Sequence, residues 1–198
     1  MGRRKLVADA DLLAIGRRVF VEHGAAASTR EIARQAGVSE AVIYQRFGTK
    51  ERFVLAAMAP PDFDVETLFS RRSGSPLTHL ESIALGMLGY FRDLIPVLVP
   101  LLADPAFDFE EFARLHPAAP TNQLRARLDA YLHELRARGE IEAADPSAAA
   151  LVFFGALFSI AVFERLGAHG GAFTDTMVRS MVEAVWFGLN PRTSPTPA

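Results

Sequence analysis

Residues 28–50, STREIARQAGVSEAVIYQRFGTK, decide the fold, because they carry the start and stop signals of two short helices. Ser28 and Glu31 have the spacing of a capping box, which predicts a helix over residues 30–36. Gly37 follows at the position where a helix end favours a left-handed residue. The first half of the stretch therefore reads as one short helix ending in a tight turn.

The second half begins with Ser39, a helix-capping residue type that predicts a helix over residues 40–47. Val42, Ile43 and Phe47 supply the inward side of this helix. Two short helices joined by a glycine-containing turn form a helix–turn–helix, and the second is short enough to enter a DNA major groove. The residues left to face outward are Glu40, Ala41, Tyr44, Gln45 and Arg46.

The charge distribution separates this end of the chain from the rest. Residues 1–57 carry ten Lys and Arg against six Asp and Glu, a net charge of +4. The whole chain carries −2, so residues 58–198 carry −6. A basic end on an acidic body fits a polyanionic partner for that end. Residues 3–5, Arg-Arg-Lys, form either an arm that can reach DNA or a solvated, disordered tail.

Residues 9–56 resemble the N-terminal domain of the TetR family of transcriptional regulators. The matching features are Ser28 and Thr29, Ile32 and Ala33, Gly37 to Ser39, Ile43 and Tyr44, Phe47, and Lys50 and Glu51. The resemblance implies an all-α fold of about nine helices. It also implies a homodimer, through the last two helices, that binds a DNA operator and represses transcription until a small-molecule effector enters the larger C-terminal domain.

The expected organisation has three parts. Residues 1–58 form a three-helix helix–turn–helix domain, and Pro60 and Pro61 mark its end. Residues 59–190 form a ligand-binding and dimerisation domain, and residues 191–198 a disordered tail. The alternatives are a helical protein-interaction module, a DNA-binding regulator that needs no ligand, and an activator in place of a repressor.

The DNA contacts divide into backbone and base contacts. By resemblance, Tyr44 and Lys50 match positions that contact the DNA backbone, and Arg30 matches one that can reach a base. Helix N-termini at Ser28–Thr29 and Thr49 offer amides to phosphate. Tyr44 can alternatively pack half-buried between helices. The expected base readers are Glu40, Ala41, Gln45 and Arg46.

Glu40 is unusual among these, because a carboxylate near phosphates costs affinity. It can accept a hydrogen bond from a cytosine amino group. The alternatives are stabilisation of the helix start through the dipole and pairing with a nearby Arg.

Apolar periodicity predicts the remaining helices. Pro96 and Pro100 are expected to kink or break the apolar run that contains them. The predicted ranges are 9–23, 50–58, 65–69, 77–93, 94–102, 104–116, 121–138, 145–163 and 174–189.

The last two of these helices are the candidate dimer interface. Residues 148–163 are apolar on every side, and residues 174–189 carry an apolar stripe that includes Val182. A helix that is apolar all round needs covering on all sides, by its own chain or by a second copy. On the dimer interpretation, Val182→Glu gives monomers; on the alternative of a buried intrachain pair, it unfolds the chain.

The C-terminal domain is expected to enclose a mostly apolar pocket for a hydrophobic ligand. Ordinary core packing is the alternative role for each of the aromatic side chains proposed to line it. The candidates are Tyr90, Tyr131, His133, Phe154 and Phe158.

The sequence contains no motif typical of an enzyme, such as a nucleophile elbow, a P-loop or a zinc-protease helix. The five histidines lack ligand spacing, and the acidic run over residues 104–111 reads as a solvated helix start more readily than as a cation site. No catalytic residue, metal or cofactor is therefore expected. The chain has no cysteine, no secretory signal and, with Arg92 and Asp93 inside the longest apolar run, no expected membrane span, so we expect a cytoplasmic protein.

Overall fold

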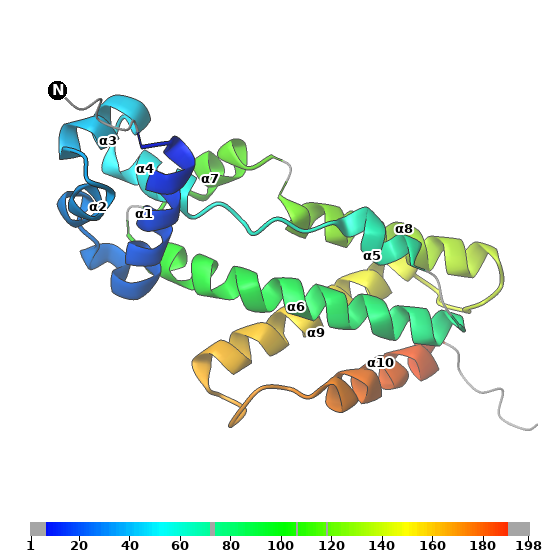
Figure 1. Ribbon diagram of the computed structural model, residues 1–198. Coiled ribbons are helices and arrows are strands. Elements are labelled where there is room, and N and C mark those ends of the chain that lie inside the picture. The colour runs from blue at the N-terminus through cyan, green and yellow to red at the C-terminus, as the bar shows by residue number, and fades with distance from the viewer. Residues whose placement is uncertain (1–6, 72–73, 106, 118, 190–198) are drawn as a thin grey trace, which may run out of the picture. The chain divides into compact units, whose positions relative to one another are not determined.

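The computed structural model describes residues 7–71, 74–105, 107–117 and 119–189 (Figure 1). This part of the chain is all helical and without a strand, as predicted, and has ten α-helices where about nine were expected. The predicted basic arm and C-terminal tail lie outside the described residues. The helices are α1 (Asp9–His23), α2 (Thr29–Ala36), α3 (Glu40–Phe47), α4 (Lys50–Ala57), α5 (Val65–Ser70), α6 (Pro76–Leu102), α7 (Phe109–Leu115), α8 (Pro120–Ala137), α9 (Pro146–Leu166) and α10 (Asp175–Leu189), with a short 3-10 helix, η1 (Gly24–Ala26), after α1.

The turn between α2 and α3 forms as the sequence predicts. Gly37 ends α2 in the left-handed region, with φ 69° and ψ 26°, a conformation that costs glycine little. Gly48 ends α3 at φ 86°. Thr49 then caps α4, its hydroxyl accepting a hydrogen bond from the Arg52 amide at 3.2 Å. Local chemistry therefore fixes the lengths of α2 and α3.

The chain divides into two compact units. The first comprises the residues up to Pro60 together with Leu94–Pro117, and the second comprises Pro61–Asp93 and the residues from Ala118 onward. In the first unit, the α1–α4 core also receives Val97, Leu101 and Phe112. The domain boundary predicted at residue 58 stays a prediction. The first compact unit contains residues 94–117 in addition to the N-terminal helices.

The prolines of α6 do not break it, so of the two expected outcomes, a kink or a break, the break is wrong. Pro96 and Pro100 both lie inside one helix of 27 residues. Each removes a backbone hydrogen bond, at a cost of about 3 kcal/mol in a helix interior. Ile95, Val97 and Leu101 between and beside them are buried, and burial of such side chains contributes about 1.5–3 kcal/mol each. Tertiary packing of these three side chains is therefore comparable to the local penalty and offsets it.

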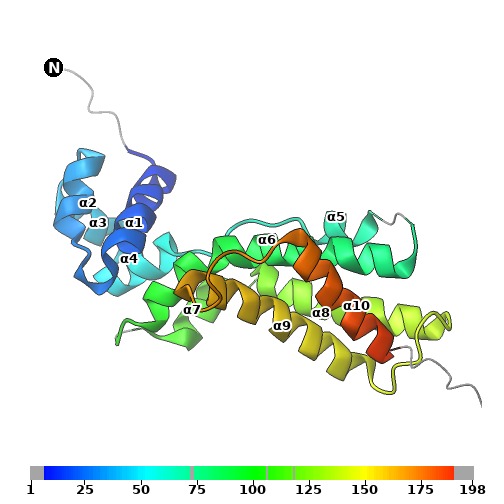
Figure 2. The same ribbon diagram turned by 90° about the horizontal axis from the view of Figure 1, so that it is seen from below.

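In the second unit, α8 packs along α9 (Figure 2), and α5 packs on α8 (Figure 1). Arg92 of α6 donates to both carboxylate oxygens of Glu164 on α9, at 2.8 and 2.7 Å, and to the Phe173 carbonyl at 2.8 Å. Glu164 in turn accepts from the Phe173 amide. This ion pair joins α6, α9 and the segment that leads into α10.

Two helices begin differently from the prediction. Ser28 makes no side-chain capping bond among the described residues. The Glu31 carboxylate, which would reach back to Ser28 in a capping box, instead accepts from Arg34 and Gln35 within its own helix. The helix expected from residue 104 begins at Phe109, after Asp108. The Asp108 carboxylate accepts from the Glu111 amide and so caps α7.

Candidate DNA interface

The recognition helix α3 is held by its inner face and leaves its outer face accessible. Ile43 is fully buried in the core of the first unit, and Val42 and Phe47 are half-buried. Ala41, Tyr44 and Gln45 are exposed. The predicted division between inward and outward residues therefore holds for most of the helix, and two residues depart from it.

Glu40 is the first of these two residues. Its carboxylate oxygen Oε1 accepts a hydrogen bond from Thr29 Oγ1 at 2.5 Å and lies 3.4 Å from the Tyr44 hydroxyl. The Thr29 and Tyr44 hydroxyl oxygens are 3.0 Å apart. Thr29 is only 4% exposed, whereas Tyr44 is 40% exposed. We name Thr29, Glu40 and Tyr44 the hydroxyl–carboxylate cluster; it ties the start of α2 to α3.

Arg46 is the second. Its guanidinium donates to the Val7 carbonyl at 2.7 Å and to Asp9 Oδ1 at 2.9 Å. The side chain is only 21% exposed. Arg46 therefore joins α3 to the start of α1. Its role as a base reader stays a prediction, and it requires that Arg46 first release the Val7 carbonyl and Asp9.

The start of α2 presents Arg30 and Ser28 to solvent, and contact of Arg30 with a base stays a prediction. The neighbouring Glu31 carboxylate accepts hydrogen bonds from Arg34 and Gln35 of the same helix. The hydrogen bonds from Arg34 and Gln35 lower the pKa of Glu31 to about 2. Glu31 is thus a paired carboxylate on the same helix as Thr29 and outside the hydroxyl–carboxylate cluster.

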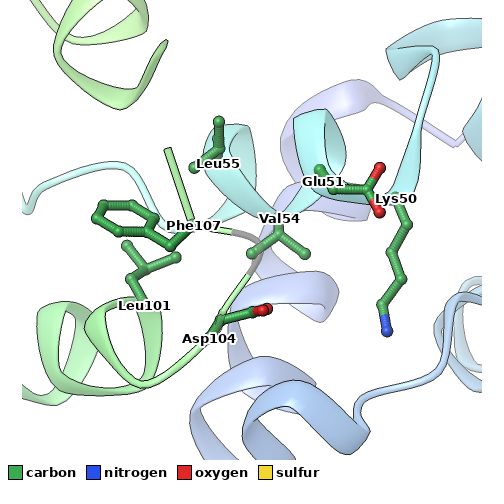
Figure 3. A pocket seen from close by; sticks show the side chains of 7 residues that line it. All are labelled: Lys50, Glu51, Val54, Leu55, Leu101, Asp104 and Phe107. Carbon is green, nitrogen blue, oxygen red and sulfur yellow. The ribbon is translucent and has the colours of Figure 1, made fainter. Parts of the chain in front are cut away.

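The start of α4 carries Thr49 and Lys50. Lys50 is half-buried and lies beside a cavity of about 140 Å³ within the first unit (Figure 3). The Glu51 backbone amide and the Thr49 hydroxyl hold the pKa of the Glu51 carboxyl below its usual value. The apolar walls come from α4, the end of α6 and the segment before α7, and the lining residues are Lys50, Glu51, Val54, Leu55, Leu101, Asp104 and Phe107.

Three of the five aromatic side chains proposed for a ligand pocket, Tyr90, Phe154 and Phe158, have rings that contact Phe91. Phe154 and Phe158 meet Phe91 edge-on, at centroid distances of 5.1 and 5.5 Å. Tyr90 is buried, and burial raises the pKa of its hydroxyl, which bonds with Thr121 at 2.9 Å.

Tyr131 is buried against His79, whose Nδ1 lies 2.9 Å from the Tyr131 hydroxyl. Both line a cavity of about 490 Å³ at the start of α6. His133 is exposed and bonds with Ser147. The pocket assignment of these residues stays a prediction.

In the described part of the chain, no three His, Cys, Asp or Glu side chains are placed to hold a metal ion. In the acidic run, Asp108 caps α7 and Glu111 pairs with Arg52 and Arg114. Asp108 thus lies at a helix start, as the sequence favoured, whereas Glu111 is held in ion pairs and is only 25% exposed. By length and composition alone, helices α6 and α9 could cross a membrane, but core helices of soluble proteins meet the same criteria; the most apolar 18 residues of each are 44% and 33% buried within the chain.

Two arrangements escaped the sequence-based predictions. The Thr29–Glu40 bond joins residues 11 positions apart in different helices, and Arg92 and Glu164 are 72 positions apart. Helical periodicity relates only residues within one helix. The available signal for the first was the carboxylate of Glu40, unusual near phosphates, at the start of the helix that the sequence predicts to read DNA.

Comparison with known proteins matches both parts of the chain to sequence families. Residues 12–57 match the bacterial regulatory proteins of the tetR family. Residues 98–186 match the C-terminal domain of the AefR-like transcriptional repressors. No curated protein matches the chain.

Solved structures share the fold across nearly the whole chain. The TetR family transcriptional regulator PfmR of Thermus thermophilus has 20% identity and a TM-score of 0.63, covering 91% of this chain and 96% of its own. FadR of Bacillus subtilis, a transcriptional regulator solved with stearoyl-CoA, has 18% identity and a TM-score of 0.64, covering 92% and 100%. NalD of Pseudomonas aeruginosa, a secondary repressor of the MexAB-OprM multidrug efflux pump, has 20% identity and a TM-score of 0.59, covering 94% and 97%.

Proposed function

The chain belongs to the TetR family of transcriptional regulators, and we propose that it is a homodimeric, cytoplasmic repressor released from its operator by a small hydrophobic ligand. On this proposal it carries no catalytic activity of its own. The observation that carries the DNA-binding part is the outer face of α3, where Ala41, Tyr44 and Gln45 are exposed while Ile43 anchors the helix in the core. Such a face can reach base edges and phosphates without disturbing the core.

Dimerisation through α9 and α10 is supported by large apolar side chains that one chain leaves exposed. On α9, Leu151, Val152 and Leu166 are 63–65% exposed, and Phe163 is 48% exposed. Contiguous exposed apolar surface is typical of protein interfaces. Val182 does not belong to this face, because it is fully buried within its own chain. Val182→Glu is therefore expected to unfold the chain, and it cannot serve as the dimer test that the sequence suggested.

An apolar effector is supported by the half-buried Phe154 and Phe158 rings on Phe91 in the second unit. The stearoyl-CoA bound to the Bacillus subtilis regulator makes a long acyl chain a reasonable first probe. Such a ligand would act by favouring a spacing of the two reading heads that misses the half-sites.

The test is fluorescence anisotropy with labelled duplexes from the region upstream of the chain's own gene. We expect saturable binding that weakens steeply with salt. Addition of long-chain acyl compounds should then lower the anisotropy. Binding to DNA that no bound compound reverses would favour the ligand-independent regulator, and no binding to any duplex would favour the protein-interaction module.

A further inference from the structure

We propose that the Glu40 carboxylate occupies, in the free protein, the position at which the Thr29 and Tyr44 hydroxyls hold a DNA phosphate. Glu40 is then an internal competitor that must leave the cluster before the operator binds. This inference rests on the proposed function. It starts from the geometry of the hydroxyl–carboxylate cluster, in which one carboxylate oxygen lies 2.5 Å from Thr29 Oγ1 and 3.4 Å from the Tyr44 hydroxyl.

The protons of the cluster are already used. Each hydroxyl has one proton to donate. Thr29 gives its proton to Glu40, so the one Tyr44 proton is directed either to Thr29 at 3.0 Å or to Glu40 at 3.4 Å. Both hydroxyl protons therefore point into the cluster, and a hydroxyl that donates to a phosphate while Glu40 stays in place gives up the bond that it makes there.

A carboxylate and a phosphate diester compete for this position because both are anionic oxygen acceptors. Hydrogen bonds to ionised acceptors are shorter and roughly twice as strong as neutral ones. Two such anions repel each other at close range. Phosphate contact by Tyr44, which is 40% exposed, thus requires that the Glu40 side chain turn away or lose its charge.

Competition of this kind lowers affinity for every sequence equally, because phosphates carry no sequence information. This uniform effect distinguishes competition for a phosphate from base reading by Glu40, which would change discrimination at one base pair. A third possible role for Glu40 is a passive brace that holds α2 against α3. In that case its removal would weaken DNA binding.

Glu40→Gln is the deciding variant, because the amide keeps the shape and an acceptor oxygen for Thr29 but loses the charge. We expect it to bind all duplexes about fivefold tighter or more, with unchanged sequence preference. Glu31→Gln is the matched control, since it removes the same charge from a paired carboxylate of α2 outside the cluster. Its effect should stay below about twofold.

The same pair of substitutions is then measured in a Tyr44→Phe background. If Glu40 competes for the Tyr44 hydroxyl, the gain from Glu40→Gln falls to about that of the Glu31 control. Glu40→Ala, checked for folding by circular dichroism, should show the same direction as Glu40→Gln.

Each remaining outcome overturns the inference in a recognisable way. Weaker binding by folded Glu40→Gln shows a brace, and altered preference at one base pair shows a base reader. An equal gain in the Tyr44→Phe background shows only general charge repulsion. Failure of the wild type to bind any duplex overturns the proposed function as well, whereas the other three leave it standing.

Discussion

At the residue scale, Arg46 shows how a side chain expected at a DNA base can serve the fold. The spacing placed it on the outer face of α3, yet its guanidinium donates to the Val7 carbonyl and to Asp9. The Arg46 guanidinium is only 21% exposed, and its hydrogen bonds to these two acceptors are charge-assisted. The local pattern could not reveal this, because the acceptors lie 37 and 39 positions away.

Arg46→Ala should therefore lower the free energy of unfolding by about 1–2 kcal/mol, since the Val7 carbonyl and Asp9 lose their donor. Chemical denaturation followed by circular dichroism measures this. Arg30→Ala is the control: Arg30 is exposed, so its loss should change stability by less than about 0.5 kcal/mol. Equal stability of the two variants would show that the Arg46 contacts contribute nothing.

Lys50 gives a second prediction at this scale. Lys50→Ala should weaken binding to all duplexes alike and reduce the slope of log affinity against log salt by roughly one. Arg125→Ala, which removes an exposed positive charge from α8 in the second unit, should leave that slope unchanged. A changed sequence preference with an unaltered slope would make Lys50 a base reader.

At the element scale, the predictions succeeded where a helix carries its own signals. Gly37, Gly48 and the Asp145–Pro146 pair fix helix ends through backbone geometry and capping, and these ends lie where expected. The predictions failed where distant residues decide. Pro96 stays inside α6 because its neighbours Ile95 and Val97 are buried. Rules based on the local sequence do not include the free energy of this tertiary burial.

The Arg92–Glu164 pair between α6 and α9 supports a pH prediction. Hydrogen bonds from Arg92, and then from the Phe173 amide, hold the pKa of Glu164 below its usual 4.5. The ionised form is thus favoured in the folded state, so its stabilisation is present above the unfolded pKa and is lost as pH falls through the folded pKa.

Glu164→Gln should accordingly lower the free energy of unfolding at pH 7 by about 1–2 kcal/mol, a modest figure because Arg92 is 36% exposed. The difference from wild type should shrink as the pH falls below 4.5. Denaturation at several pH values measures this, with Glu183→Gln on the exposed face of α10 as the control. A difference that persists at low pH would mean that packing, not charge, explains the loss.

At the scale of the whole molecule, the exposed apolar face of α9 predicts self-association. Val152 is 64% exposed in one chain, so Val152→Glu should fold normally, give monomers and weaken operator binding by tenfold or more. Light scattering coupled to size-exclusion chromatography measures the mass. Phe109→Glu, at a side chain 65% exposed on α7, should leave the mass of the wild type unchanged. A dimeric Val152→Glu would place the interface elsewhere.

The central claim is that two copies of the α2–α3 helix pair read one operator, and selection from randomised duplexes by the full chain tests it most directly. The preferred sites should contain two inverted half-sites whose centres lie a whole number of helical turns apart, with two chains bound per duplex. Enriched sites without inverted repetition, each bound by a single chain, would contradict the account.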